Sequence, residues 1–169
     1  MLTLRRATPA DAAKLSLVGG ASFLESFADD HPGDALVNHV RDSHSIAVYE
    51  DWLNDPAYAL WIVEEALGAP VGYAMLGPGG LPGTTAGDFE IKRIYVLRRW
   101  HGGGFGKRLF LRCCQEARMR GATRVFLAVY TANQLAQQFY THQGMSVIGK
   151  TIFMVGETEF TDLVMAMEL

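Results

Sequence analysis

A glycine-rich segment constrains this chain more than any other feature. Residues 88–96 have the apolar pattern of a strand, four of the five residues 102–106 are glycine, and a helical pattern begins near Leu109. Successive glycines let a backbone turn tightly and approach a ligand, and the amide groups that open the next helix attract anions. The segment therefore predicts a strand, a turn that can hold phosphate groups, and a helix.

The charge around this turn points to an anionic ligand. Arg98, Arg99, Lys107 and Arg108 flank it, although the formal net charge of the whole chain is -3. A local basic cluster in an acidic protein favours one small anion over a nucleic acid spread across the surface. A flexible glycine hinge with solvated cations is the other interpretation that the loop alone leaves open.

The register of the glycines excludes two common phosphate motifs. A P-loop needs glycine five residues before the Gly106–Lys107 pair and Ser or Thr after it, but His101 and Arg108 occupy these positions. A dinucleotide fingerprint fails in both possible frames, because His101 or Lys107 interrupts it. The turn therefore predicts neither a nucleoside triphosphatase nor a nicotinamide-dependent oxidoreductase.

Length and composition predict one domain over residues 1–169. Cys113 and Cys114 are sequence neighbours, so they cannot form a disulfide framework, and this favours a reducing, cytoplasmic setting. No basic region followed by a long apolar stretch opens the chain, so neither secretion nor membrane spanning is expected. We expect no metal site.

The hydrophobic pattern predicts an alternation of strands and helices. Thr8 and Pro9 begin a helix after a first short strand at Leu2 and Leu4. The remaining expected elements are two short helices within 23–52, a hairpin of 58–63 and 71–76, strands at 88–96 and 125–130, and two closing strands at 145–153 and 163–169.

A second group of residues lies on the helix expected after Thr131. Thr131 and Gln134 predict a capping box, and Gly144 can close the helix. The spacing places Asn133 and Tyr140 on one face, near the carboxyl end of a strand, where open α/β sheets bind ligands. It places Leu135 and Phe139 on another face, toward the core. An ordinary amphipathic tyrosine is the alternative for Tyr140.

Together these two groups resemble the acetyl-CoA-binding core of the GCN5-related N-acetyltransferase (GNAT) superfamily. The family's turn is Arg or Gln, two residues, Gly, one residue, and Gly or Ala; Gly104 and Gly106 fill the glycine places, and His101 stands where Arg or Gln is usual. The later motif matches at Asn133, Phe139, Tyr140 and Gly144. The resemblance implies a mixed, mostly antiparallel α/β sheet of about seven strands with about four helices. It implies acetyl-CoA contacts at Ile94, Tyr95, Val96, His101, Gly102, Gly103, Gly104, Phe105, Gly106, Lys107, Asn133, Ala136, Phe139 and Tyr140.

The resemblance extends to a branch of the superfamily. Segments at 23–27, 90–96 and 153–165 are similar to the bacterial PaiA-type branch, whose known activity is polyamine acetylation. The region 23–52 is acidic, which suits a cationic amine or is an ordinary solvated surface; its acids include Glu25, Asp29, Asp30, Asp34 and Asp42. Other acceptors stay open: a protein N-terminus or lysine, an amino acid, or an aminoglycoside. A non-catalytic acyl-CoA sensor stays open as well, and a homodimer is expected from the family alone.

The family's chemistry assigns a role to Tyr140, and the position of Glu90 on the strand before the turn makes it the candidate base. The acceptor amine attacks the thioester directly, Tyr140 protonates the departing CoA thiolate, and backbone N–H groups near Val96 polarise the thioester carbonyl. Glu90 is the expected general base, acting through water; strict alternation would put it on the strand face of Ile94 and Val96. The alternative for Glu90 is a strand residue paired with Lys92 or Arg93.

Overall fold

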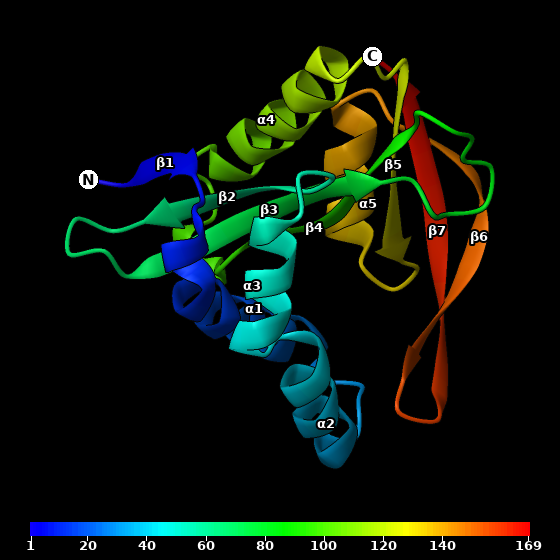
Figure 1. Cartoon of the computed structure of the whole chain (residues 1–169). Helices are drawn as coiled ribbons and strands as arrows, with labels where there is room; N and C mark the ends of the chain where they lie inside the picture. Colours follow the sequence, from blue (N-terminus) through cyan, green and yellow to red (C-terminus); the bar gives the residue numbers. More distant parts are fainter.

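A computed structural model describes all residues from 1 to 169, and it contains one seven-stranded sheet and five α-helices (Figure 1). The expected α/β GNAT architecture is confirmed, with one helix more than the approximate count. The elements are β1 (Thr3–Arg6), α1 (Ala12–Phe27), α2 (Gly33–Ser43), α3 (Ile46–Asn54), β2 (Ala59–Glu64), β3 (Pro70–Pro78), β4 (Phe89–Val96), α4 (Phe105–Met119), β5 (Arg124–Tyr130), α5 (Gln134–His142), β6 (Ser146–Val155) and β7 (Thr158–Glu168), with short 3-10 helices η1 (Pro9–Asp11) and η2 (Arg98–Trp100).

The sheet opens between its two central strands. Its order is β1-β2-β3-β4-β5-β7-β6, and every neighbouring pair is antiparallel except β4 and β5. These two parallel strands pair only at Phe89 with Val125 and Glu90 with Phe126. Beyond these pairs the carboxyl halves of β4 and β5 are not hydrogen-bonded to each other. Backbone groups at this end of the sheet are therefore free to meet a ligand.

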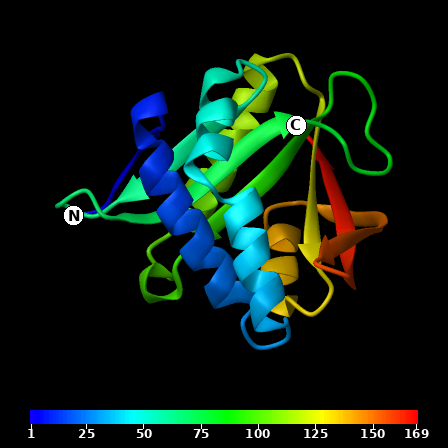
Figure 2. The same ribbon diagram turned by 60° about the horizontal axis from the view of Figure 1, so that its bottom comes forward.

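Helices cover both faces of the sheet. On one face, α4 and α5 enclose a core of 20 buried residues that includes Leu109, Phe110 and Tyr140. On the other, α1 and α3 enclose nine buried residues around Tyr49 and Tyr73. Figure 2 shows α1 and α2 side by side in front of the sheet. This three-layer arrangement buries the strands on both sides, so β2 and β3 are almost uniformly apolar.

Most local predictions hold. The hairpin of β2 and β3 is present, α4 follows the glycine turn, and α5 follows β5 directly. Gly121 and Gly144 adopt positive φ just after α4 and α5, as helix-closing glycines do. Both cysteines lie inside α4 and are buried, so their small side chains fill the core.

Two predictions about α5 are wrong. Asn133, not Thr131, is the N-cap: its side chain accepts a hydrogen bond from the Ala136 amide, whereas the Thr131 hydroxyl donates to the Thr161 carbonyl oxygen. Leu135 does not face the core, because its side chain is 81 % exposed. The buried face of α5 is formed by Ala136, Phe139 and Tyr140, and Leu135 in the first turn of the helix lies outside it.

β7 begins at Thr158, five residues before the expected start at Leu163. Its first half has no apolar alternation, yet it pairs with β6 through a tight hairpin at Gly156, where φ is +62°. Backbone pairing in the hairpin, rather than a hydrophobic pattern, defines this part of the strand.

Candidate active site

The opening between β4 and β5 presents backbone donors. The Leu97 amide donates to the Val71 carbonyl oxygen at 2.9 Å, so this amide points toward β3. Amide directions alternate along a strand, which turns the N–H groups of Val96 and Ile94 toward β5, where pairing has ended. Two aligned N–H groups without a strand partner can polarise a carbonyl oxygen.

The glycine turn requires glycine for its backbone conformation. Gly102 and Gly104 have φ of +81° and +75°, and Gly104 is the N-cap of α4. A Cβ at either position would meet no atom within 4 Å. Crowding is therefore not the reason for glycine; the left-handed conformation is, and it aims successive amides at the start of the helix.

The cations of the turn are free of acidic partners. None of Arg98, Arg99, Lys107 and Arg108 is in an ion pair, although the chain has nine such pairs elsewhere. Arg108 lies over the Phe105 ring at 4.6 Å from its centroid, and Arg99 lies over Trp100. Uncompensated positive charge beside a helix N-terminus favours an anion at this place.

His101 uses its ring differently from an Arg or Gln at that position. Its Nε2 donates to the Val96 carbonyl oxygen at 2.6 Å, which closes the end of β4 onto the turn. This contact fixes the tautomer, because a carbonyl oxygen can only accept. The His101 imidazole therefore holds the glycine turn against the end of β4.

Tyr140 lies next to this opening with its hydroxyl uncommitted. The ring is 8 % exposed and packs against Phe139 and Phe110, with centroids 5.2 and 6.3 Å away. Its hydroxyl makes no hydrogen bond to another residue, in contrast to that of Tyr49. Burial, with Tyr95 and Cys113 nearby, raises the pKa of the phenol well above its usual value. The phenol keeps its proton at neutral pH and can donate it.

Packing joins the two sequence motifs. Phe139 Cζ would lie 3.8 Å from a Cβ at Gly106, so α5 sits directly against the glycine turn. Ala136 and Phe139 pack on the same core as Phe105. Residues about 30 apart in sequence thus lie side by side where α4 meets α5.

Glu90 faces away from Ile94 and Val96. The register of β3 and β4 shifts at Lys92, so Ile91 and Ile94 pack on the same core although they are three residues apart. Such a bulge reverses the alternation, and Glu90 lies on the α1–α3 face of the sheet. The expectation of a shared face is wrong for this reason.

The carboxylate of Glu90 already has hydrogen-bond partners. It accepts from Lys92 Nζ at 2.7 Å and from the Gly80 amide at 3.1 Å, and the residue is 8 % exposed. One of the two partners that the sequence offered, Lys92, is thus present, and Arg93 is directed elsewhere. The role of Glu90 as a base stays a prediction.

Sequence analysis missed a polar network under the first helices. Arg93 donates to the Tyr49 hydroxyl at 3.0 Å and to the Ser43 carbonyl oxygen at 3.0 Å, and its guanidinium lies 4.6 Å from the Trp52 ring centroid. No acid neutralises it. The network fixes the turn between α2 and α3 on the sheet, and residues about 45 apart in sequence supply it, so no local pattern marks it.

The sequence also gave no role to Asp162, which directly precedes the apolar stretch 163–167 of β7. Its Oδ1 is buried without a hydrogen-bond partner. An acid placed directly before an apolar stretch of a strand is the signal that could have marked it.

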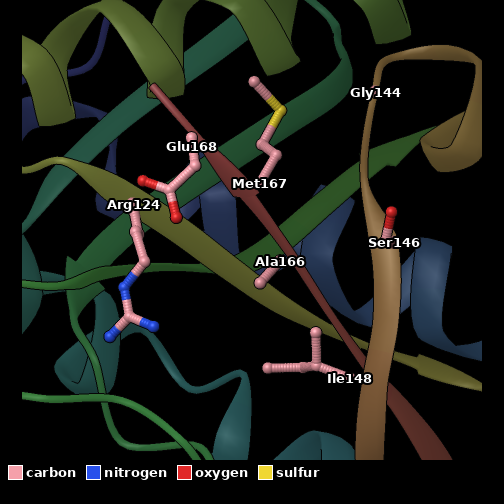
Figure 3. Close-up of a pocket in the computed structure, with 7 residues that line it drawn as sticks. All are labelled: Arg124, Gly144, Ser146, Ile148, Ala166, Met167 and Glu168. Atoms are coloured by element: carbon pink, nitrogen blue, oxygen red, sulfur yellow. The ribbon is translucent and has the colours of Figure 1, made fainter.

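An open pocket of about 550 Å³ lies elsewhere, among Arg124, Ile148 and Ala166 (Figure 3). Arg124 begins β5, at the end of the sheet opposite the glycine turn. The 15 residues of α4 separate the two places, about 22 Å at 1.5 Å per residue. The pocket plays no part in the site described above.

The fold, the β4–β5 opening and the adjoining glycine turn define an acyltransferase of the α/β class. Residues 21–145 match the model of the acetyltransferase (GNAT) family, and the chain belongs to this family. It is 31 % identical over 159 residues to an uncharacterized N-acetyltransferase of Mycobacterium tuberculosis, which covers 94 % of this chain and 98 % of the relative. The protein is thus an N-acetyltransferase by family. No helix is long and apolar enough to cross a membrane.

Solved structures share the same fold. The PaiA N-acetyltransferase of Thermoplasma acidophilum in complex with coenzyme A superimposes with a TM-score of 0.77 at 16 % identity, over 100 % of this chain and 99 % of that one. A putative acetyltransferase of Salmonella typhimurium with its cofactor acetyl-CoA gives 0.73 at 22 % identity, over 100 % and 94 %. At these identities the likeness is one of fold.

Proposed function

We propose that this protein transfers the acetyl group of acetyl-CoA to a primary amine of a small molecule, with a polyamine as the first candidate. The observation that carries the proposal is the convergence of three features at the β4–β5 opening: free backbone donors, a glycine turn with unpaired cations, and the uncommitted phenol of Tyr140. Each meets one need of acetyl transfer from a phosphorylated thioester.

The cosubstrate fits along β4 and into the turn. The amides from Gly102 to Gly106 and the start of α4 would hold the pyrophosphate, with Lys107 as a nearby cation. The strand amides from Ile94 to Val96 would bind the pantetheine arm and polarise the thioester carbonyl. Ala136, Phe139 and the capped end of α5 at Asn133 would form the opposite wall.

The chemical step begins with a free amine. At pH 7 an alkylamine with a pKa of about 10.4 is neutral in about one molecule in 2,500, so a base is required. The nitrogen attacks the carbonyl carbon, the C–S bond breaks, and the Tyr140 phenol donates its proton to the departing sulfur. Glu90 is the predicted base, and to act it must keep a water molecule in reach while it is bound to Lys92.

A polyamine suits the charge of the acceptor side. The segment from α1 to α2 carries exposed acids, of which Asp29 and Asp34 have no ion-pair partner. The PaiA N-acetyltransferase of Thermoplasma acidophilum shares the fold, and the polyamine is suggested by the resemblance of segments 23–27, 90–96 and 153–165 to the PaiA-type branch. A protein N-terminus, a lysine side chain, an amino acid or an aminoglycoside is the alternative acceptor, because a primary amine is the one requirement of the step.

A panel of amines tests the proposal. Release of thiol from acetyl-CoA would be followed with spermidine, spermine, a lysine peptide, an alanine peptide and an aminoglycoside, and CoA affinity would be measured by calorimetry. We expect saturable acceleration by at least one amine, with a polyamine fastest. Binding of acetyl-CoA without acceleration by any amine would support a sensor instead. Absence of CoA binding would overturn the proposal entirely.

A further inference from the structure

Asp162 is the least satisfied charged group in the molecule. Its Oδ1 is buried and has no hydrogen-bond partner, whereas Asp11, Glu64, Asp88 and Glu90 are all buried with cations beside them. A carboxylate oxygen that is buried without a partner costs stability, and folded proteins keep few such atoms. A ligand that carries a hydrogen-bond donor or a positive charge would supply the missing partner.

The position of Asp162 is at the open end of the sheet. It pairs across β7 and β5 with Tyr130, the last residue of β5, at the end where β4 and β5 have separated. The Thr161 carbonyl oxygen accepts from the Thr131 amide at 3.1 Å and from its hydroxyl at 2.9 Å. These bonds fix the backbone beside Asp162, so its carboxylate has a defined position.

The Asp162 side chain lies on the face of the sheet that α1 and α2 cover, where the amine acceptor would bind. Leu163 and Met165 pack with α4 and α5, whereas Phe160 packs against the cluster under α1 and α2. Since side chains alternate along a strand, Asp162 shares the face of Phe160 and lies opposite the α4–α5 side. The cosubstrate would therefore reach β4 from the α4–α5 side of the sheet, whereas the amine would reach Asp162 from the opposite side.

Aromatic rings and one further acid surround this place. Tyr130 lies edge-on to Phe160 with centroids 5.6 Å apart and near Phe27 at 6.1 Å, and its hydroxyl donates to Asp30 at 2.9 Å. A carboxylate among aromatic faces is a suitable environment for an ammonium group. The same arrangement would repel an anionic acceptor.

We propose that Asp162 is the carboxylate that receives the ammonium group of the acceptor and takes its first proton. The proposal rests on the acetyl transfer proposed above and specifies which residue prepares the amine for it. It assigns to Asp162 the task that sequence analysis gave to Glu90, whose charge Lys92 already compensates.

The protons balance as follows. The acceptor arrives as an ammonium ion and gives one proton to Asp162, which leaves a neutral amine. The nitrogen lone pair forms the C–N bond, and the C–S bond breaks to leave a thiolate. The Tyr140 phenol protonates the thiolate, and the second nitrogen proton restores the phenol through water. Asp162 then releases its proton to solvent, so the products are amide, CoA thiol and one proton.

The titration of Asp162 agrees with this task. Burial raises the pKa of its carboxyl from 3.8 to about 6, and no cation of the chain lowers it. The titratable groups that face it are Tyr130 on β5 and Tyr95 on β4, with Asp30 and His31 beyond Tyr130. A base whose pKa lies near neutral pH accepts a proton better than an ordinary aspartate.

Asp162→Asn tests the assignment through its pH dependence. Thiol release would be measured from pH 6 to 9.5 with saturating acetyl-CoA and the most active amine of the panel. We expect about 100-fold slower turnover at pH 7, with the deficit shrinking toward pH 9.5 because the amine then loses its proton to solvent. Glu159→Gln, which removes an exposed acid from the same strand, is the matched control and should match wild type.

The outcomes separate the two proposals. A ratio of wild-type to Asp162→Asn turnover that stays near one, or stays constant with pH, overturns the role of Asp162. The same pH-dependent deficit in Glu90→Gln and not in Asp162→Asn returns the role to Glu90. Absence of acceleration by any amine in wild type defeats the acetyl transfer itself, and the role of Asp162 with it.

A stability measurement tests whether Asp162 serves function at a cost in stability or is a structural carboxylate. A carboxyl with a raised pKa favours folding below its unfolded value of 3.8, and this contribution is lost as the pH rises through about 6. Asp162→Asn should therefore raise the midpoint of thermal unfolding, and by more at pH 8 than at pH 5. A lower midpoint at pH 8 would show a structural carboxylate and overturn the proposal.

Discussion

The two faces of the sheet are built on different principles. The α4–α5 face encloses 20 buried residues, and its one polar side chain at the site, Tyr140, carries an uncommitted hydroxyl. The α1–α3 face has a core of nine buried residues and holds the charges: Arg93, Glu90 and Asp162 all lie on it or at its edge. The first face is stabilised by apolar burial, the second by specific polar contacts.

This difference matches two tasks. A nucleotide thioester has constant chemistry, so a turn, a helix start and two strand amides can hold it with backbone groups. The acceptor must be selected and deprotonated, which requires side chains of particular charge. Changes on the first face should therefore alter cofactor affinity or the chemical step, and changes on the second should alter stability or the handling of the amine.

Tyr140→Phe should have the largest effect. Loss of the phenolic proton donor should lower turnover about 100- to 10,000-fold, while CoA affinity and the unfolding midpoint stay near wild type, because the hydroxyl bonds no other residue. Steady-state kinetics and calorimetry measure the two properties. Wild-type turnover in this variant would remove Tyr140 from the mechanism.

Arg93→Met should affect stability more than any comparable change on the other face. The substitution deletes the hydrogen bonds from the guanidinium to the Tyr49 hydroxyl and to the Ser43 carbonyl oxygen, and it leaves the Tyr49 hydroxyl with His44 Nδ1 as its remaining partner. At roughly 1.5 kcal/mol or more for each bond to a charged group, we expect a loss of about 3 kcal/mol. Urea unfolding measures it, with Arg112→Met on the exposed side of α4 as the control. A midpoint equal to that of the control would contradict the network.

Gly104→Val tests the glycine turn. A β-branched residue at φ of +75° costs about 1–2 kcal/mol, so CoA should bind about tenfold more weakly as the turn relaxes to another conformation. Gly149→Val is a suitable comparison, because that glycine is outside the turn, has no positive φ and has no neighbouring atom within 4 Å. Equal CoA affinity in both variants would argue against a phosphate site here.

A change of pH should affect the stability of the α1–α3 face through His44. Burial beside Arg93 lowers the pKa of His44 to about 3, below its unfolded value of 6.5. Between these two pH values His44 is protonated in the unfolded chain and neutral in the folded chain. The free energy of unfolding therefore decreases as the pH falls from 6.5 toward 3. The urea midpoint of His44→Asn should fall less than that of wild type between pH 7 and 4.5; parallel curves would disprove the contribution of His44.

Features with local causes were predictable. Glycines at 102–106, the apolar run of β5 and the spacing of α4 each follow from backbone freedom or a hydrophobic period. The β3–β4 bulge at Lys92 was not, because the pattern assumed strict alternation and placed Glu90 on the wrong face. The cap of α5 was missed for a similar reason, since Thr131 satisfies the motif and yet binds β7 instead.

The sequence by itself determined the order of elements, the glycine turn with its flanking cations and the family to which the chain belongs. These depend on residues that are close in sequence, so short-range physical rules reveal them. Only the tertiary structure decided that β4 and β5 separate after two residue pairs, that Phe139 meets Gly106, and that Oδ1 of Asp162 is buried without a partner. Such features arise where distant segments pack, and the charge left uncompensated there depends on every neighbour at once.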